Sequence, residues 1–474
     1  MSGIHAYGVY LPRRRLQRST IAEASVWFDA GLKGHAHGER TMCNWDEDVV
    51  TMCTEAARAV GELPPIDRIH MASTTFPFAD RQNSGIVAEA LALDNSVRPM
   101  DICGSLRAGT TALVASLEMS GGSLVVSADN RKARTGSIAE MQYGDGAVAV
   151  VTGEDDGIAK FLGAATVSAD FIDHFRADGI AYDYDWEERW IRDEGYLNLI
   201  PQAVSSLQSK LYFPVGEYDY LILPIAQARV LPAVAKQLGI NPDAIVDNLM
   251  RGCGHTGASH ALLMLASVLE DAKPGEKILL IGFGQGCDAI ALEVTQAHSL
   301  FRPVVGVESA LTHRVEETNY AMYQTFAGLV EREFGKRAEV DRSPALSAHN
   351  RNRKMVNSFM GGRCTECGTV QFPKAYYCVS PNCGKGGSQE DFVMSTVSGK
   401  VKTYTADRLT FDMSPPAYFG LVEFQGGGRA MVDFSEVNAE KFDVGSLVRM
   451  AFRIKHVDER RGYKTYFWKA VPTD

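Results

Sequence analysis

The sequence contains no long apolar segment. It has no run of about 18 apolar residues, which is the length that a membrane-spanning helix requires. Its amino-terminal stretch, MSGIHAYGVYLPRRRLQ, also lacks the apolar core and cleavage site of a secretory signal. We therefore expect a cytoplasmic protein without a membrane partner.

An excess of positive charge is missing as well. The chain has 48 Lys and Arg against 58 Asp and Glu, which gives a formal net charge of -10 at pH 7. Proteins that bind nucleic acids normally present a basic face, so we expect no nucleic-acid partner. The 474 residues suffice for two or three domains, and a hydrophobic content of 45% is ordinary for a globular protein.

Cysteine is sparse outside one cluster. Five of the nine cysteines stand alone in the sequence: Cys43, Cys53, Cys103, Cys253 and Cys287. In a reducing compartment we expect these to be thiols, and buried thiols behave as small hydrophobic side chains. We predict that Cys103 is such a buried thiol, placed in a strand.

The other four cysteines form a Cys-x2-Cys pair and a Cys-x4-Cys pair, separated by ten residues. They are Cys364, Cys367, Cys378 and Cys383. Four thiolates on two short turns can close a tetrahedron around zinc and leave no coordination position open. A disulfide or a redox pair does not account for two such pairs in a cytosolic chain. We predict a structural zinc site.

The first 296 residues alternate short apolar segments, bounded by Gly or Pro, with helical segments. The pattern predicts strands within 3–12, 68–77, 121–129 and 144–153. Helices with apolar residues three and four positions apart are predicted within 46–60 and 108–120. This alternation indicates an α/β fold with largely buried central strands.

An internal repeat relates residues 105–130 to residues 254–284. Each copy has a small-residue turn, a helix entered with Ala-Leu, a Gly-containing turn and an apolar strand, and a Gly-rich strand follows each. The alignment places Leu106 opposite His255. A duplicated unit would bring two helix N-termini, with free N–H groups, to one pseudo-two-fold axis, where they suit a thioester oxygen. The alternative is ordinary βαβ similarity.

The composition changes after residue 296. Residues 321–340 predict an amphipathic helix, and residues 341–355 form a polar, basic linker or docking arm. From residue 393 to the end, short alternating strands with Gly turns indicate a small barrel.

The chain resembles two known families. GVYLPRRRL, GDGAVAV and GHTGASHALLMLASVLEDAKPGEKILLIGFGQGCDAIALE are similar to the thiolase superfamily, in the branch of hydroxymethylglutaryl-CoA synthase and ketoacyl-ACP synthase III. GGRCTECGTVQFP and the closing strands resemble the rubredoxin-like zinc-ribbon and OB-fold proteins that accompany acyl-CoA thiolases and aldolases. This resemblance implies a duplicated five-layer αβαβα fold followed by a zinc ribbon and an OB-fold barrel. It also implies an acyl-CoA substrate, with coenzyme A as part of it, and a homodimer formed through the central sheets.

We divide the chain accordingly into five parts. Residues 1–160 and 161–296 are the two thiolase-like halves, 297–345 a helical linker, 346–392 the zinc ribbon and 393–474 the OB-fold barrel.

The resemblance fails at the catalytic positions. The family's nucleophilic cysteine falls on Leu106 in SLRAGT, its histidine on Pro224, and its asparagine on His255 in GHTGAS. The acidic residue of hydroxymethylglutaryl-CoA synthases falls near Thr74. Because acyl-enzyme chemistry needs an activated nucleophile with a base in reach, a condensation by the family mechanism is not expected. Ser105 is predicted to cap the helix that follows.

We predict an aldolase or lyase that cleaves a β-hydroxyacyl-CoA through a thioester enolate. The leading acid or base is His255, whose alternative role is a structural helix cap. Residues 170–196 are rich in polar side chains and are expected to line the pocket. We assign catalytic roles there to His174, Glu188 and Tyr196; for each, a surface or ion-pair role is the alternative.

Substrate-binding roles are predicted for Ser105, Leu106, Arg107, Tyr182 and Thr256. The Arg107 side chain would meet a carboxylate or phosphate of the substrate or, alternatively, form a surface ion pair. The basic run 13–15 is a candidate contact for the phosphates of coenzyme A. Two other functions stay open: an acyltransferase resembling hydroxymethylglutaryl-CoA synthase or ketoacyl synthase, and a non-catalytic scaffold.

Overall fold

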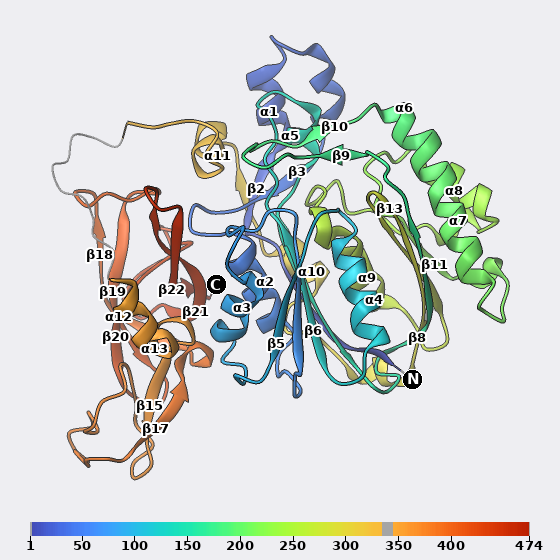
Figure 1. Ribbon diagram of the computed structural model, residues 1–474. Helices are drawn as coiled ribbons and strands as arrows, with labels where there is room; N and C mark the ends of the chain where they lie inside the picture. Colours follow the sequence, from blue (N-terminus) through green and yellow to red (C-terminus); the bar gives the residue numbers. More distant parts are fainter. Residues whose placement is uncertain (1, 334–344, 474) are drawn as a thin grey trace. The chain divides into compact units, whose positions relative to one another are not determined.

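The structure, a computed structural model, describes residues 2–333 and 345–473. The chain forms two compact units (Figure 1). The first comprises Met1–Asn44, Asp48–Gly85 and Asn95–Val330; the second comprises Trp45–Glu47, Ile86–Asp94 and Glu331–Asp474. Among the described residues, no helix has both the length and the apolar character needed to cross a membrane.

A nine-stranded sheet organises the first unit, in the order β11-β12-β13-β8-β1-β7-β6-β4-β5. One half contains β1 (Gly3–Tyr10), β7 (Gly146–Gly153), β6 (Ser123–Asp129), β4 (Arg68–Ala72) and the edge strand β5 (Arg98–Ile102). The other half contains β8 (Ala159–Ser168), β13 (Gly286–Val294), β12 (Lys277–Phe283) and β11 (Tyr220–Ile222).

The two halves repeat one pairing scheme. In each half, two antiparallel pairs follow one another outward from the centre (β1–β7–β6 and β8–β13–β12), and the next pair is parallel (β6 with β4, β12 with β11). Antiparallel pairing of β1 with β8 joins them. The structure therefore confirms the duplication and the four strands predicted in the first half.

Helices form three layers around the two half-sheets (Figure 1). The outer layers are α2 (Val49–Ala59) on the first half, and α7 (Leu197–Gln208) with α8 (Leu231–Leu238) on the second. Between the half-sheets lie α4 (Ala108–Glu118) and α9 (His260–Asp271). This is the predicted five-layer αβαβα arrangement.

Sequence explains where these helices begin and how closely they pack. Asp48 starts α2 because its carboxylate accepts the N–H groups of Val50 and Thr51. The central helices approach so closely that a Cβ on Gly109 of α4 would lie 2.2 Å from the Ala258 carbonyl oxygen before α9. Only glycine permits that approach, so the two helix N-termini lie side by side, as the repeat predicts.

Shorter elements complete the first unit. A small sheet joins β14 (Val315–Glu317), β2 (Arg14–Gln17) and β3 (Glu39–Met42), and a hairpin joins β9 (His174–Phe175) to β10 (Tyr184–Asp185). Its remaining helices of four or more residues are α1 (Arg18–Ser25), α5 (Ile138–Gln142), α10 (Val307–Thr312), α11 (Tyr320–Phe326), and the η helices Ala30–His35, Ile191–Tyr196 and Gln296–Leu300. The helix α3 (Asn83–Ala90), which follows β4, begins in the first unit and ends in the second.

Our prediction of one long helix over residues 321–340 is wrong about its length. The helix observed is α11, which ends at Phe326 because Gly328 adopts a left-handed conformation with φ of 65°. Residues 334–340 of the predicted helix lie outside the described residues. The predicted arm at 341–355 contains α12 (Leu346–Arg351) and the start of α13 (Arg353–Asn357), and its first four residues also lie outside the description.

The second unit contains two small sheets. The first has β15 (Met360–Cys364) between β16 (Val370–Gln371) and β17 (Gln389–Val393). The second is five-stranded, in the order β20-β19-β18-β21-β22. Its strands are β18 (Gly399–Asp407), β19 (Ala417–Phe424), β20 (Arg429–Asp433), β21 (Leu447–Asp458) and β22 (Tyr463–Pro472). A bridge from Phe434, just after β20, to Ala470 of β22 brings the two edges of this sheet together, so the predicted small barrel is present. Its OB-fold assignment and the five domain boundaries stay predictions.

Candidate active site

The turn before α4, residues 103–107, contains no reactive group at the position that the resemblance assigns to the nucleophile. Leu106 occupies it. The Ser105 hydroxyl donates to the Gly284 carbonyl at 2.5 Å and accepts from the Arg107 N–H at 3.2 Å. Our prediction that Ser105 caps α4 is wrong, because Arg107 is the N-cap residue of that helix. Our prediction of a buried Cys103 is wrong: β5 ends at Ile102, so Cys103 lies beyond the strand and is exposed.

Arg107 is engaged within the protein. Its Nη1 lies 2.9 Å from Asp288 Oδ1, and its Nε donates to the Gly284 carbonyl at 3.0 Å. The Asp288 carboxylate also accepts from the hydroxyls of Thr110 and Thr111. Because Asp288 is buried, this is an internal ion pair, and it leaves the predicted contact with a substrate anion without support.

The turn before α9, residues 254–257, presents His255. Its Nδ1 receives two donors at 3.1 Å, Arg131 Nη2 and the Gly257 N–H, and its Nε2 lies 3.2 Å from the Pro224 carbonyl. Carbonyl oxygens only accept, and guanidinium and backbone N–H groups only donate, so the proton sits on Nε2. The ring therefore has no free lone pair, and its single N–H points at the Pro224 carbonyl. The residues that the resemblance aligns with the family's histidine and asparagine thus meet.

His255 stacks on a second buried histidine. The rings of His255 and His260 are 4.3 Å apart at an angle of 24°. His260 donates from Nε2 to the Asn248 carbonyl at 2.9 Å, and its Nδ1 accepts from the Thr256 N–H at 3.3 Å. Burial holds the pKa of His255 well below its usual value, with His260 and Arg131 adding to the effect, and burial lowers the pKa of His260 to about 4. Both rings are neutral at pH 7.

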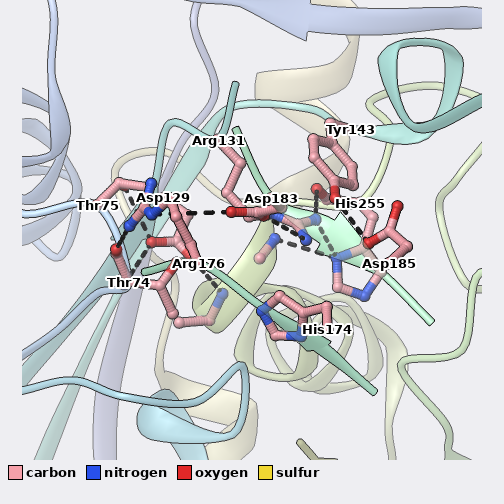
Figure 2. Close-up of polar contacts among 12 residues, drawn as sticks. Thr74, Thr75, Asp129, Arg131, Tyr143, His174, Arg176, Asp183, Asp185 and His255 are labelled. Carbon is pink, nitrogen blue, oxygen red and sulfur yellow. Dashed lines mark hydrogen bonds and ion pairs between the residues drawn. The ribbon is translucent and has the colours of Figure 1, made fainter. Parts of the chain in front are cut away.

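Arg131, which sequence reasoning missed, lies at the centre of the cluster (Figure 2). Its guanidinium carbon is 3.8 Å from the centre of the Tyr143 ring, and its Nη1 is 3.9 Å from Asp183 Oδ2. The side chain is 4% exposed. Arg131 is one of two arginines in the run NRKAR, and it carries no signal in the sequence because the fold brings its partners to it.

The β9–β10 hairpin brings polar groups to the same cluster. In Figure 2, Asp183 and Asp185 point toward Arg131, Tyr143 and His255, with the His174 ring beneath them in this view. The Tyr143 hydroxyl donates to Asp185 Oδ1 at 3.1 Å. Residues 170–196 thus reach the site, as predicted, although not through every residue that we named.

His174 is paired with its neighbour on this hairpin. Its Nδ1 lies 3.3 Å from Asp173 Oδ2, and the two side chains are 12% and 8% exposed. Burial alone lowers the pKa of His174, but contact with the Asp173 carboxylate outweighs burial, so the pKa is raised. A histidine oriented in this way can gain and lose a proton near neutral pH.

Asp129 connects the ends of β4 and β6 to the residues before α9 through hydrogen bonds. At the end of β6, this buried carboxylate accepts from the hydroxyls of Ser73, Thr74 and Thr75 and from the N–H groups of Thr74 and Ala258, at 2.7–3.1 Å. The position that the resemblance aligns with an acidic residue is therefore a hydroxyl that binds a carboxylate from the neighbouring strand. Sequence reasoning missed Asp129.

The other predicted site residues lie in different places around this cluster. Glu188 is exposed at the start of α6 (Glu188–Trp190), and Tyr182 stacks on Arg134 at 5.0 Å. The Tyr196 ring packs 4.7 Å from Phe283, and its pKa is raised by burial. Thr256 is buried, and its hydroxyl accepts from Ser259 at 2.9 Å. Within the part of the chain that the structure describes, none of these four forms a hydrogen bond or ion pair with Arg131 or His174.

A cavity of about 510 Å³ opens beside the loop between β11 and α8, which contains Pro224 and which we call the Pro224 loop. It is lined by Arg18, His37, Ala226, Ala228, Asn248, Met250 and Arg251. Burial lowers the pKa of Arg18 to about 10, so its guanidinium stays charged at pH 7. The wall residue Asn248 is the one that accepts from His260. The predicted basic run is not part of this lining: Arg14 pairs with Glu317 at 2.7 Å, and the buried Arg15 donates to the Ala310 carbonyl.

The four clustered cysteines meet in the second unit. All their sulfur atoms lie within 4.8 Å of one another, with Cys364 Sγ 3.8 Å from Cys383 Sγ and Cys367 Sγ 3.6 Å from Cys378 Sγ. A zinc ion bound to four sulfurs at about 2.3 Å requires sulfur–sulfur separations of about 3.8 Å. The donor set therefore fits a closed, structural zinc site.

Known proteins match both units. Residues 210–294 match the family described as 3-oxoacyl-[acyl-carrier-protein (ACP)] synthase III C terminal, and residues 351–388 match ChsH2, rubredoxin-like zinc ribbon domain. The hydroxymethylglutaryl-CoA synthase of Aeropyrum pernix is 31% identical over 342 residues, covering 69% of this chain and 94% of that protein. The hydroxymethylglutaryl-CoA synthase of Methanosphaera stadtmanae is 26% identical over 70% of this chain and 99% of its own length.

Solved structures share the fold. MvaS in complex with 3-hydroxy-3-methylglutaryl coenzyme A aligns with a TM-score of 0.61 at 18% identity, covering 83% of this chain and 99% of that one. The 3-oxoacyl-[acyl-carrier-protein] synthase III from Aquifex aeolicus aligns with a TM-score of 0.54 at 21% identity, covering 62% and 100%.

Proposed function

Because the chain belongs to the hydroxymethylglutaryl-CoA synthase family of the thiolase superfamily, we propose that it cleaves or forms a carbon–carbon bond in a CoA thioester without an acyl-enzyme. The reaction that we favour is retro-aldol cleavage of a β-hydroxyacyl-CoA. The observation that carries it is the turn before α4, where Leu106 stands at the nucleophile position and the neighbouring Arg107 is bound to Asp288. A leucine cannot hold an acyl group, so the bond change must proceed on the bound thioester.

The proposed polarising group is His255. We infer that its Nε2–H leaves the Pro224 carbonyl, 3.2 Å away, and donates to the thioester oxygen of the substrate. A neutral imidazole N–H can stabilise an enolate oxygen, and a donor placed in advance is effective in a site that excludes water. This role replaces the proton exchange that we predicted for His255, because its Nδ1 is already engaged.

The proposed base is His174, oriented by Asp173. It takes the proton of the β-hydroxyl group, the Cα–Cβ bond breaks, and the electron pair passes to the thioester as an enolate while a ketone or aldehyde leaves. The proton held by His174 then returns to the enolate carbon, which gives the shortened acyl-CoA. Atoms and charge balance without a co-reactant.

For coenzyme A we propose the cavity beside the Pro224 loop. Arg18, Arg251 and His37 give it a basic lining, which suits phosphates, and Asn248 in its wall connects it to the His255–His260 pair through a hydrogen bond. A thioester entering here would reach the α9 turn.

We also propose a homodimer through the first unit. β5 is an edge of the nine-stranded sheet, its Met100 is 46% exposed, and Cys103 beyond it is exposed. Pairing β5 with its copy would cover this edge. Light scattering on the full chain and on Met100→Lys, which should dissociate, tests it.

Condensation is the second candidate. It is favoured by the relatives, which are hydroxymethylglutaryl-CoA synthases that align over at least 94% of their length in both organisms named above. The same groups serve it in reverse: His174 withdraws the α-proton, His255 stabilises the enolate, the enolate carbon attacks a ketone, and the resulting alkoxide takes the proton back from His174.

The test is a product assay on the full chain. A set of β-hydroxyacyl-CoA thioesters is incubated with wild type, His174→Gln and, as a matched control in the second unit, His456→Gln. We expect a shortened acyl-CoA and a carbonyl product from wild type and His456→Gln, and a loss of about 100-fold or more in His174→Gln. Neither cleavage nor condensation, together with no binding of CoA thioesters, would favour a scaffold and refute the proposal.

A further inference from the structure

We propose that Arg131 is the positioning residue that fixes the Nε2–H tautomer of His255, so that the single N–H of the ring is directed toward the Pro224 carbonyl, where the proposed thioester oxygen would replace that carbonyl as acceptor. This inference rests on the proposed function, since the substrate contact of that N–H belongs to it. We call the fixing of the His255 tautomer by Arg131 the lock, and it is a property of the protein without substrate.

The geometry of Arg131 allows only one tautomer beside it. Its Nη2 lies 3.1 Å from both Nδ1 and the backbone carbonyl oxygen of His255. A guanidinium donates and cannot accept, so Nδ1 must present its lone pair. The Gly257 N–H, also at 3.1 Å, reinforces this but carries no charge.

The arginine is itself held in place. Tyr143 stacks on its guanidinium at 3.8 Å, and the Tyr143 hydroxyl is bound by Asp185 at 3.1 Å. Asp183 lies 3.9 Å from Arg131 Nη1 and also 3.9 Å from Arg176 Nε. Because Tyr143 and Asp183 already hold the planar guanidinium of Arg131, this side chain loses little entropy when it binds His255.

Several titratable groups surround His255, and burial is the main cause of its low pKa. His260 stacks on it from α9, His174 approaches from β9, Asp183 and Asp185 come from the hairpin, and Arg131 follows β6. Because burial persists without Arg131, the arginine acts on the tautomer and the orientation of the ring rather than on its charge. Without Arg131, Nδ1 keeps the Gly257 N–H but loses its charged donor.

The inference predicts a distinct result for each substitution. In Arg131→Met, an Nδ1–H tautomer of His255 becomes populated beside the Nε2–H tautomer, whereas wild type holds the Nε2–H tautomer alone. Arg131→Lys keeps a charged donor but not the planar guanidinium, so the tautomer is kept while the ring is less well oriented. Arg176→Met is the matched control, because it removes a positive charge from the same cluster without touching His255.

The experiment is long-range ¹⁵N–¹H NMR of the full chain with labelled histidine, from about pH 5 to about pH 8, with the His255 ring assigned by its absence in His255→Gln. We expect the Nε2–H tautomer alone in wild type and Arg176→Met, and a second, Nδ1–H tautomer in Arg131→Met. The turnover of Arg131→Met should fall about tenfold across this pH range.

Other outcomes separate the two proposals. A His255 ring that shows both tautomers in wild type, or only the Nε2–H tautomer in Arg131→Met, overturns the lock even if cleavage is observed. If Arg131→Met does not fold, the wild-type spectrum and the Arg131→Lys variant decide. A second His255 tautomer in wild type refutes the role of the Arg131 guanidinium. So does an Arg131→Lys protein whose His255 orientation and turnover are both identical to those of wild type. Absence of any C–C bond activity refutes the proposed function but leaves the spectra of the lock valid.

Discussion

The turns before α4 and before α9 are copies of one unit, and they have been put to opposite uses. The α4 turn is closed: Ser105 and Arg107 are bound to Gly284 and Asp288 within the protein. The α9 turn carries a neutral histidine whose N–H has only a 3.2 Å contact with a carbonyl. Equivalent backbone geometry therefore does not fix function, since the side chains that surround each helix N-terminus decide whether it reacts, polarises or only packs.

Removing the polarising group gives the largest expected effect. His255→Leu should lower kcat by about 100- to 1000-fold, because a donor to the developing oxyanion is lost. His298→Leu is the control, since His298 is also a buried histidine that donates to a backbone carbonyl, that of Leu269. It should lose stability but keep its turnover per folded molecule. Equal loss of kcat in both variants would contradict the role of His255.

Separating the two turns should cost stability. In Gly109→Val, the new Cβ would lie 2.2 Å from the Ala258 carbonyl, and the central helices must part. We expect a loss of about 3 kcal/mol in the free energy of unfolding, measured in urea. Gly104→Ala, in the α4 turn, meets no atom within 4 Å and has only the strain of φ at 92°, so it should cost about 1 kcal/mol. Similar losses would mean that the approach of the helices is not tight.

Loss of the carboxylate beside His174 should act through pH. With Asp173→Asn, burial is left to lower the His174 pKa, so the rise of kcat with pH should move to lower pH, and kcat at its plateau should fall about tenfold. Asp178→Asn, exposed on the same hairpin, is the control. A pH profile identical in wild type and Asp173→Asn would exclude His174 as the base.

The same pair has a pH-dependent effect on stability. The raised pKa of His174 means that the pair stabilises the folded state fully below the unfolded histidine pKa of about 6.5. That contribution disappears as the pH rises through the folded-state pKa. The difference in free energy of unfolding between wild type and Asp173→Asn should therefore be largest at acidic pH and small at alkaline pH.

Restoring the missing thiol is expected to do least. Leu106→Cys in a Cys103→Ser background should give no acyl adduct in the intact protein mass after incubation with acetyl-CoA, because Pro224 offers no base to form the thiolate. Its stability should change by no more than about 1 kcal/mol. A stable adduct at residue 106 would show that the α4 turn can still support acyl transfer. The missing thiol would then be the one difference between this site and a condensing site.

The comparison of the turns also shows what sequence can reveal. The duplication was predictable because apolar spacing and Gly turns are local, and Leu106 and His255 followed from aligning the copies. Arg131 and Asp129 were not, because their partners lie up to 129 residues away and only the sheet brings them together. The exposed Cys103 was missed because β5 ends one residue earlier than its apolar neighbours suggest, and the end of α11 depended on the backbone conformation of Gly328.

The central claim, enolate chemistry without an acyl-enzyme, is tested most directly by incubating the full chain with acetyl-CoA in D2O. Deuterium in the thioester α-carbon and the intact mass of the protein are measured together by mass spectrometry. We predict deuterium incorporation that His174→Gln and His255→Leu abolish, with no increase in protein mass. An acetylated protein, or no exchange under conditions where a CoA thioester binds, would contradict it.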